Sequence, residues 1–165
     1  MSVNSQSGDH LFNFVLCILT SSDIDILELT IHSAINQTYN VYDVYVIVNT
    51  LDKSYYQKVL DLCNTKFSGK IKQIIETESN GKPGMGHNSL LHVFSKTQYD
   101  YMVTCDGDDF LYPVALSRIN SLLQKNTYDV INLLGNPSKL FISDKQIHQL
   151  VESNIKKFTW EQSIT

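Results

Sequence analysis

Short apolar runs alternate with amphipathic stretches along most of the chain, and this alternation limits the possible folds more than any other feature. The apolar runs predict strands over residues 12–20, 42–48, 70–75, 99–105 and 128–134. In the stretches between and after them, apolar residues recur at spacings of three and four, which indicates helices. Strands joined by helices need crossover connections. The chain is therefore expected to be an α/β protein with a largely parallel sheet covered on both faces.

The helices are expected over residues 24–34, 56–63, 88–96, 113–122 and 144–155. The first follows an N-cap at Ser22-Asp23, and Pro113 suits the first turn of the fourth, where its missing N–H costs nothing. The predicted buried faces of the first, second and fourth helices are Ile24, Leu27, Ile31 and Ala34; Tyr56, Val59, Leu60 and Cys63; and Ala115, Ile119 and Leu122.

The length and composition fit one folded domain. The chain has 165 residues, of which 42% are hydrophobic and 18% charged, so it can bury a core. We expect a flexible N-terminus over residues 1–11 and a single domain over residues 12–165. The net charge is −4, and no Lys/Arg cluster is longer than Lys156-Lys157, which argues against duplex nucleic acid as a partner.

The cysteines and the hydropathy of the chain indicate the cellular compartment of the protein. Cys17, Cys63 and Cys105 are widely spaced, and we expect them to be reduced core residues. Residues 1–10 are polar and lack the basic and apolar regions of a signal peptide. No apolar run approaches the ~20 residues that a membrane-spanning helix needs. Together these features predict a soluble, cytoplasmic protein.

Parallel sheets bind ligands at the carboxyl ends of their strands. This rule selects the loops formed by residues 20–23, 49–54, 76–87 and 106–112. The third of these loops is rich in glycine and leads into the helix expected over 88–96. A ligand site is therefore expected where these loops meet.

The loop after the fourth expected strand carries three carboxylates within four residues, in the run Asp106-Gly107-Asp108-Asp109. These carboxylates repel one another unless a counter-charge is present. Carboxylate oxygens suit Mg²⁺ or Mn²⁺, which complete their coordination with waters and phosphates. The alternative is a simple turn, because Asp-Gly is a common turn dipeptide and Asp109 could cap the next helix. The position of the cluster at the end of a buried strand favours the metal site.

Three segments resemble family 2 glycosyltransferases, which have the GT-A fold. Residues 106–116 resemble the family's segment D-x-D-D-x-x-x-P-x-x-L, and residues 31–39 resemble its helix ending S-x-x-x-Q-T-Y. Residues 80–88 match in length its loop N-x-G-x-x-x-A-R-N. The resemblance covers about residues 12–135. It implies a Rossmann-like, three-layer GT-A domain with a mostly parallel central sheet, and an activity that depends on a nucleotide sugar.

The resemblance also assigns roles to residues. It implies that Asp106 lies near the ribose and the metal, and that Asp108 is a direct metal ligand. Asn49 stands where the family usually has a base-reading Asp, and His87 where it often has Arg. Lys82 could contact a phosphate or remain a solvated loop residue, and Asn49 could instead cap a turn. The residues expected at the nucleotide sugar are Thr20, Ser21, Ser22, Asn49, Lys82, Asn88, Asp106 and Gly107.

The reaction that the resemblance implies is an inverting displacement assisted by Mn²⁺ or Mg²⁺. A hydroxyl of a glycan, lipid or protein acceptor attacks the anomeric carbon of a UDP- or GDP-sugar, which needs a general base near that hydroxyl. Glu161 is the candidate base, although residues 159–162 also fit a capping box that opens a helix. The acceptor half is expected to be short, so the chain is either a piece of a longer transferase or a minimal domain.

Two other functions stay open on the sequence. The chain could be a non-catalytic module that binds a nucleotide sugar. A nucleotidyltransferase is less favoured, because those enzymes usually carry a glycine-rich loop with Arg or Lys directly after the first strand, and residues 20–23 lack it.

Overall fold

The structure is a computed structural model, described for residues 11–77, 82–126 and 128–131. The chain forms two compact units, residues 1–125 and 126–165, and the described strands and helices lie in the first. In chain order they are β1 (Phe14–Thr20), α1 (Ile24–Ile35), β2 (Tyr42–Val48), α2 (Lys53–Lys66), β3 (Gln73–Glu76), α3 (Pro83–Phe94), β4 (Tyr101–Asp106) and α4 (Ala115–Leu123). The expectation of a single domain over residues 12–165 stays a prediction.

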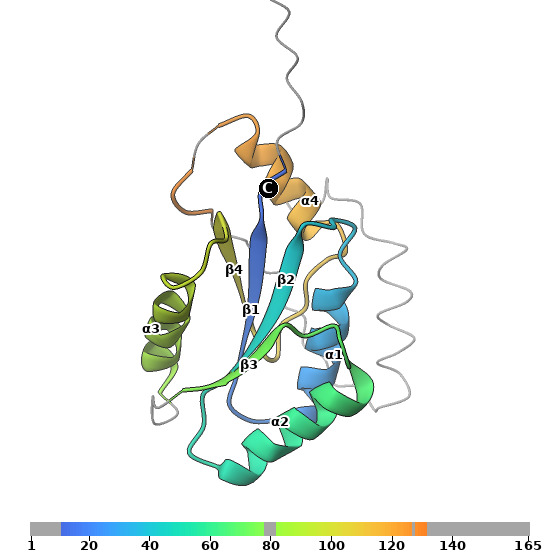
Figure 1. Ribbon diagram of the computed structural model, residues 1–165, viewed down its shortest axis with the longest axis vertical. Coiled ribbons are helices and arrows are strands. Elements are labelled where there is room, and N and C mark those ends of the chain that lie inside the picture. The colour runs from blue at the N-terminus through green and yellow to red at the C-terminus, as the bar shows by residue number, and fades with distance from the viewer. Residues whose placement is uncertain (1–10, 78–81, 127, 132–165) are drawn as a thin grey trace, which may run out of the picture. The chain divides into compact units, whose positions relative to one another are not determined.

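The described strands form one parallel sheet in the order β3-β2-β1-β4. Helix α3 lies on one side of the sheet, and α1 and α2 lie on the other (Figure 1). The helices thus form the crossover connections that consecutive parallel strands require. The result is a three-layer α/β arrangement with a parallel central sheet, as predicted.

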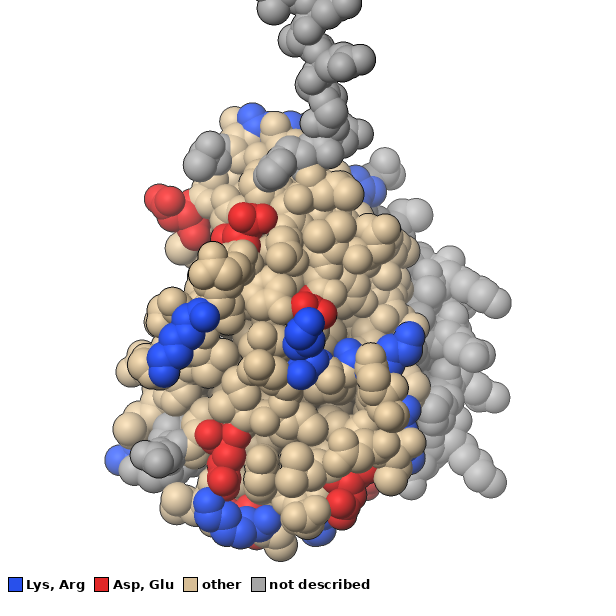
Figure 2. Space-filling view, viewed as in Figure 1, with Lys and Arg blue, Asp and Glu red and all other residues tan. Residues whose placement is uncertain are grey.

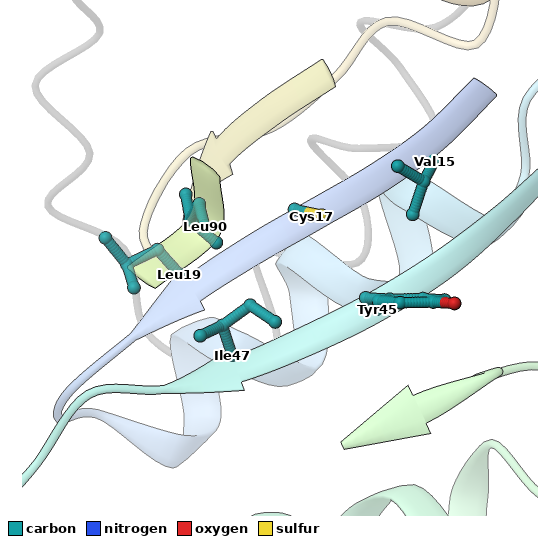
Figure 3. Packing of buried hydrophobic residues seen from close by; sticks show 6 residues of the cluster. All are labelled: Val15, Cys17, Leu19, Tyr45, Ile47 and Leu90. Atoms are coloured by element: carbon teal, nitrogen blue, oxygen red, sulfur yellow. The ribbon is translucent and has the colours of Figure 1, made fainter. Parts of the chain in front are cut away.

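The core lies on both faces of the sheet. All residues of β1 are buried, as expected for a central strand of a sheet covered on both sides. The cluster on the α3 face consists of Val15, Cys17, Leu19, Tyr45, Ile47 and Leu90 (Figure 3). Because side chains alternate along a strand, Leu16 and Ile18 lie on the opposite face, where Leu27 and Ile31 of α1 are also buried. Both layers of helices therefore pack on β1 through apolar side chains.

Several element boundaries differ from the prediction. Helix α3 begins at Pro83, before the predicted start at residue 88, since Pro is a good first helical residue and Gly84 and Gly86 only lower the helix propensity. Helix α4 begins after Pro113, whose carbonyl accepts a hydrogen bond from the Thr38 N–H at 2.7 Å in the preceding turn. The boundaries of β1, β3 and β4 differ from the predicted ones by a few residues, and β2 has its predicted bounds.

The buried helix faces are partly as predicted. The buried residues are Leu27, Thr30, Ile31 and Ala34 in α1; Tyr55, Val59, Leu62 and Cys63 in α2; and Leu116, Ile119, Asn120 and Leu123 in α4. Leu122, which the spacing predicts to be buried, is 39% exposed. The buried face of α4 includes Asn120 instead. The Asn120 Oδ1 accepts hydrogen bonds from the Tyr39 hydroxyl and the Phe12 N–H, both at 3.1 Å. A polar residue thus occupies a core position that apolar spacing does not reveal.

Two predicted elements fall wholly or partly outside the described residues. Residues 128–131 are not in a strand, and the remainder of the strand predicted over 128–134 is not described. The helix predicted over residues 144–155 also lies outside the described part of the chain.

The surface carries charges of both signs. On the face shown in Figure 2, Lys and Arg side chains are interspersed with Asp and Glu. Cys17, Cys63 and Cys105 are buried with free thiols, as predicted. Among the described residues, every helix is too short or too polar to cross a membrane.

Candidate functional site

The carboxyl ends of the parallel strands lie at one edge of the sheet, as their topology requires. Backbone hydrogen bonds continue past the ends of the strands. The Asn49 N–H donates to the Thr20 carbonyl, and the Gly107 N–H donates to the Leu19 carbonyl, both at 2.7 Å. The loops after β1, β2 and β4 are therefore held side by side. The Thr77 N–H likewise donates to the Val48 carbonyl at 3.0 Å, so all four loops that the sequence selects meet at this edge.

Two glycines allow a close approach at this edge. A Cβ atom on Gly107 would lie 2.9 Å from Thr20 Oγ1 and 3.1 Å from the Leu19 carbonyl oxygen. A Cβ atom on Gly86 of α3 would lie 2.6 Å from Asn49 Nδ2. Contacts below 3.0 Å are essentially absent for real Cβ atoms, so both positions need glycine.

Tyr55 of α2 organises the loop after β1, and sequence reasoning missed it. Thr20 is buried, and its hydroxyl lies 2.5 Å from the Tyr55 hydroxyl. The Tyr55 hydroxyl donates to the Ser22 carbonyl at 2.9 Å, so its oxygen is left to accept from Thr20. Burial raises the pKa of Tyr55, so the hydroxyl keeps its proton. The exposed side chains of Ser21 and Ser22 therefore extend from a loop that the Tyr55 hydroxyl holds in place.

Asn49 is buried within the edge, with 2% of its surface exposed. Its Nδ2 donates to the Lys82 carbonyl at 3.3 Å, and its Oδ1 accepts from the Thr77 hydroxyl at 3.2 Å. These hydrogen bonds tie the end of β2 to the residue before α3 and to the loop after β3. The predicted contact between Asn49 and a base stays a prediction.

The start of α3 brings further predicted residues to this region. Lys82 is the exposed N-cap of α3 and makes no side-chain cap hydrogen bond. The His87 Nε2 lies 3.7 Å from Asp106 Oδ1, and both side chains are about half exposed. Asn88 is exposed on the same helix. The N–H groups at a helix N-terminus favour an anion nearby, which is compatible with the predicted phosphate contact.

Helix α1 anchors the acidic loop. Asp106 is the last residue of β4, and the carbonyl of Gly107, which follows it, accepts a hydrogen bond from the Thr30 hydroxyl at 2.9 Å. The Leu111 N–H donates to Ser33 Oγ at 3.1 Å. Both ends of the loop are thus fixed to α1, while the Asp106 side chain remains exposed.

The loop contains a turn, but Asp109 does not cap the next helix. The Asp109 N–H donates to the Asp106 carbonyl at 3.0 Å. The N-cap of α4 is Val114, without a side-chain cap hydrogen bond, so the suggestion that Asp109 caps this helix is wrong. Burial, and then the charges of Asp108 and Asp106, raise the pKa of Asp109. A cation near this loop would relieve the same repulsion.

The donor groups of the loop fit a cation that binds together with a phosphate ligand. Within residues 11–77, 82–126 and 128–131, no group of three His, Cys, Asp or Glu side chains could hold a metal ion by itself. Asp106 and Asp108 are exposed and offer carboxylate oxygens. Mg²⁺ and Mn²⁺ accept such partial sets, because they keep waters and take phosphate oxygens.

Comparison with solved structures shows the fold. S. aureus TarS residues 1–349 in complex with UDP-GlcNAc has a TM-score of 0.58 at 18% identity, over 79% of this chain and 38% of that chain. The mannosyltransferase PcManGT from Pyrobaculum calidifontis, in complex with GDP-Man and Mn²⁺, has a TM-score of 0.53 at 15% identity, over 68% and 32%. The match thus spans less than half of each of these structures. The shared fold is GT-A, as predicted.

Comparison of the sequence with protein families gives a more specific result. No curated protein matches the chain. A family model described as Glycosyl transferase family 2 matches residues 16–157. This range includes the loops after β1, β2 and β4 and most of the chain. The chain therefore belongs to glycosyl transferase family 2.

Proposed function

We propose that the chain carries a metal-assisted glycosyltransferase domain. The donor is a UDP- or GDP-sugar, and the sugar passes with inversion to a hydroxyl of a glycan, lipid or protein acceptor. The observation that carries the proposal is the anchoring of the Asp106–Asp108 loop beside Thr20 at the carboxyl edge of the parallel sheet. In open α/β sheets this edge is where nucleotides bind. Neighbours solved with UDP-GlcNAc, and with GDP-Man and Mn²⁺, support the donor class.

The proposed roles follow the chemistry of each group. Asp108, with Asp106, would hold Mn²⁺ or Mg²⁺, and the bound cation would offset the charge of the leaving diphosphate. Gly107 keeps the loop close enough to β1 for the nucleotide to touch both. Residues 20–22 would border the nucleoside. Lys82 and the N–H groups at the start of α3 would contact the phosphates.

The general base and the acceptor site belong to the same proposal. Glu161 lies outside the described residues and outside the family match over 16–157, and its role as base stays a prediction. A domain without an effective base would still bind donor and cation. Binding without turnover is therefore the behaviour of the alternative function, a non-catalytic nucleotide-sugar module.

Thermal unfolding tests the proposal. The chain is heated with UDP, GDP and their sugars, each with and without Mn²⁺. At a ligand concentration of 100 times Kd, binding adds about 2.7 kcal/mol, which corresponds to a rise in Tm of about 5–10 °C for a chain of this size. We expect this rise for at least one diphosphate, and only with the cation.

A matched pair of variants assigns the effect to the acidic loop. Asp108→Asn keeps the side-chain size and removes the charge, so the Mn²⁺-dependent shift should disappear. Asp61→Asn removes an exposed carboxylate of α2 that accepts a hydrogen bond from Gln57, and it should retain the shift. No stabilisation by any diphosphate would contradict the proposal. Stabilisation by nucleoside triphosphates but by no nucleotide sugar would favour a nucleotidyltransferase.

A further inference from the structure

A pocket of about 240 Å³ lies between the loops after β2 and β3, at the same sheet edge as the acidic loop. Its lining consists of Thr50, Leu51, Lys53, Glu76 and Thr77. Leu51 is 73% exposed and offers an apolar surface to whatever enters. A few polar groups beside an apolar surface are the usual lining of a small-ligand site.

The pocket contains an ion pair that contributes little to the stability of the fold. The Lys53 Nζ lies 2.5 Å from Glu76 Oε1, and the two side chains are 77% and 29% exposed. Ion pairs this exposed contribute little to stability, because water screens them. Lys53 is the first residue of α2 and Glu76 is the last residue of β3, so both are attached to regular structure. The pair therefore presents one donor and one carboxylate in the lining of the pocket.

Asn49 is not part of the lining of this pocket. Both polar atoms of its amide have partners within the protein, the Lys82 carbonyl and the Thr77 hydroxyl. The side chain is also buried beneath the edge. The charged residues in the lining of the pocket are Lys53 and Glu76.

Resting on the proposed function, we infer that this pocket takes the guanine base of a guanosine diphosphate donor. Along its hydrogen-bonding edge guanine presents an acceptor, O6, and then two donors, N1–H and N2–H. The ion pair presents the complementary series. Lys53 Nζ donates to O6, and the Glu76 carboxylate accepts from N1–H and N2–H, a bidentate arrangement with charge assistance. The Nζ of Lys53 has three donors, so it can hold O6 and Glu76 together.

Uracil fits the same pair poorly. Its edge presents a carbonyl, one N–H and a second carbonyl, so one carbonyl oxygen would face the Glu76 carboxylate. The Glu76 carboxylate would repel this carbonyl oxygen, which would also lose its hydrogen bond to water. Lys53 and Glu76 are thus specificity-determining residues for the donor base.

The distance across the sheet suits a nucleoside diphosphate. Strand β3 and strand β4 are separated by β2 and β1, and three strand spacings of ~4.8 Å amount to ~14 Å. That span is comparable with an extended nucleoside diphosphate. A base beside Glu76 of β3 can therefore belong to a ligand whose phosphates reach the Asp106 loop after β4.

Titration calorimetry with GDP, inosine diphosphate and UDP, each with Mn²⁺, tests the inference. Inosine diphosphate differs from GDP only by the absence of the N2 amino group. Loss of one hydrogen bond to a charged group weakens binding by about tenfold or more, so GDP should bind at least that much more tightly than inosine diphosphate. UDP should bind more weakly than GDP. These comparisons need only the unmodified chain.

Two variants then locate the effect. In Glu76→Gln one acceptor becomes a donor, so the ratio of the two purine affinities should fall towards one. Glu28→Gln removes a similarly exposed carboxylate, which pairs with Lys66 at 2.6 Å between α1 and α2, and it should keep the ratio. Tighter binding of UDP, or a ratio unchanged by Glu76→Gln, would overturn the inference and leave the proposed function standing. Failure of all three diphosphates to bind would contradict the proposed function itself.

Discussion

The substitution Tyr55→Phe tests how the loop after β1 is held. The Tyr55 hydroxyl lies between the Thr20 hydroxyl, at 2.5 Å, and the Ser22 carbonyl, at 2.9 Å. Phe keeps the ring that packs beneath the loop and removes only this oxygen. Thr20 is 3% exposed, so water cannot readily replace the lost partner.

The magnitude follows from the burial of the two partners. Leaving a buried hydroxyl such as that of Thr20 without its partner costs about 1–3 kcal/mol. Ser22 is exposed, and water can replace most of its hydrogen bond. We therefore expect Tyr55→Phe to lower the free energy of unfolding by about 2 kcal/mol, which corresponds to a fall in Tm of about 4–8 °C.

Urea unfolding followed by circular dichroism measures the change, and Tyr56→Phe is the matched control. Tyr56 is the next residue of the same helix and lies outside its buried face. Its hydroxyl should therefore contribute within about 0.5 kcal/mol. Equal effects of the two substitutions, or no effect of Tyr55→Phe, would refute the view that the Tyr55 hydroxyl holds this loop.

Three further predictions concern the packing and protonation of the fold. Gly107→Ala should destabilise the chain by about 1–3 kcal/mol and weaken diphosphate binding, because its Cβ would overlap Thr20; urea unfolding and calorimetry measure both effects. Gly84→Ala, whose Cβ meets nothing within 4 Å in α3, should instead raise the stability by up to about 1 kcal/mol in the same unfolding assay. Burial raises the pKa of the Cys17 thiol to about 12, so this thiol stays protonated in the folded chain while the unfolded chain ionises. Stability should then fall above pH ~9 by about 1 kcal/mol per pH unit for this group, and urea unfolding at pH 8 and pH 10 should show a smaller loss in Cys17→Ala.

Much of the sheet could be predicted because its strands are encoded locally. The run of Tyr42–Val48 has the β-branched and aromatic residues of a buried strand, and its bounds match those of β2. The position of Asp106 could be predicted in the same way, because a polar cluster directly after a buried strand must lie at the sheet edge. Parallel topology then brings the strand ends together without knowledge of any side-chain contact.

Other features depend on tertiary contacts that a single sequence does not encode. Tyr55 and Tyr56 differ in their roles because the hydroxyl of Tyr55 contacts the Thr20 hydroxyl, which is distant in the sequence. Gly86 lies in helix α3, although the low helix propensity of glycine alone suggests a loop. A glycine stands at this position because a Cβ atom would overlap Asn49. Asn120 is buried because two groups distant in the sequence donate to it, which polarity alone would not suggest.

In the proposed function, the loop after β4 holds a cation that in turn holds a nucleoside diphosphate. Anomalous scattering from manganese, in crystals grown with Mn²⁺ and the diphosphate that stabilises the chain most, measures this directly. We expect one strong peak within coordination distance of an Asp108 carboxylate oxygen, with phosphate oxygens completing the shell. A diphosphate bound at the sheet edge without manganese beside Asp106 or Asp108, or manganese bound elsewhere, would contradict it.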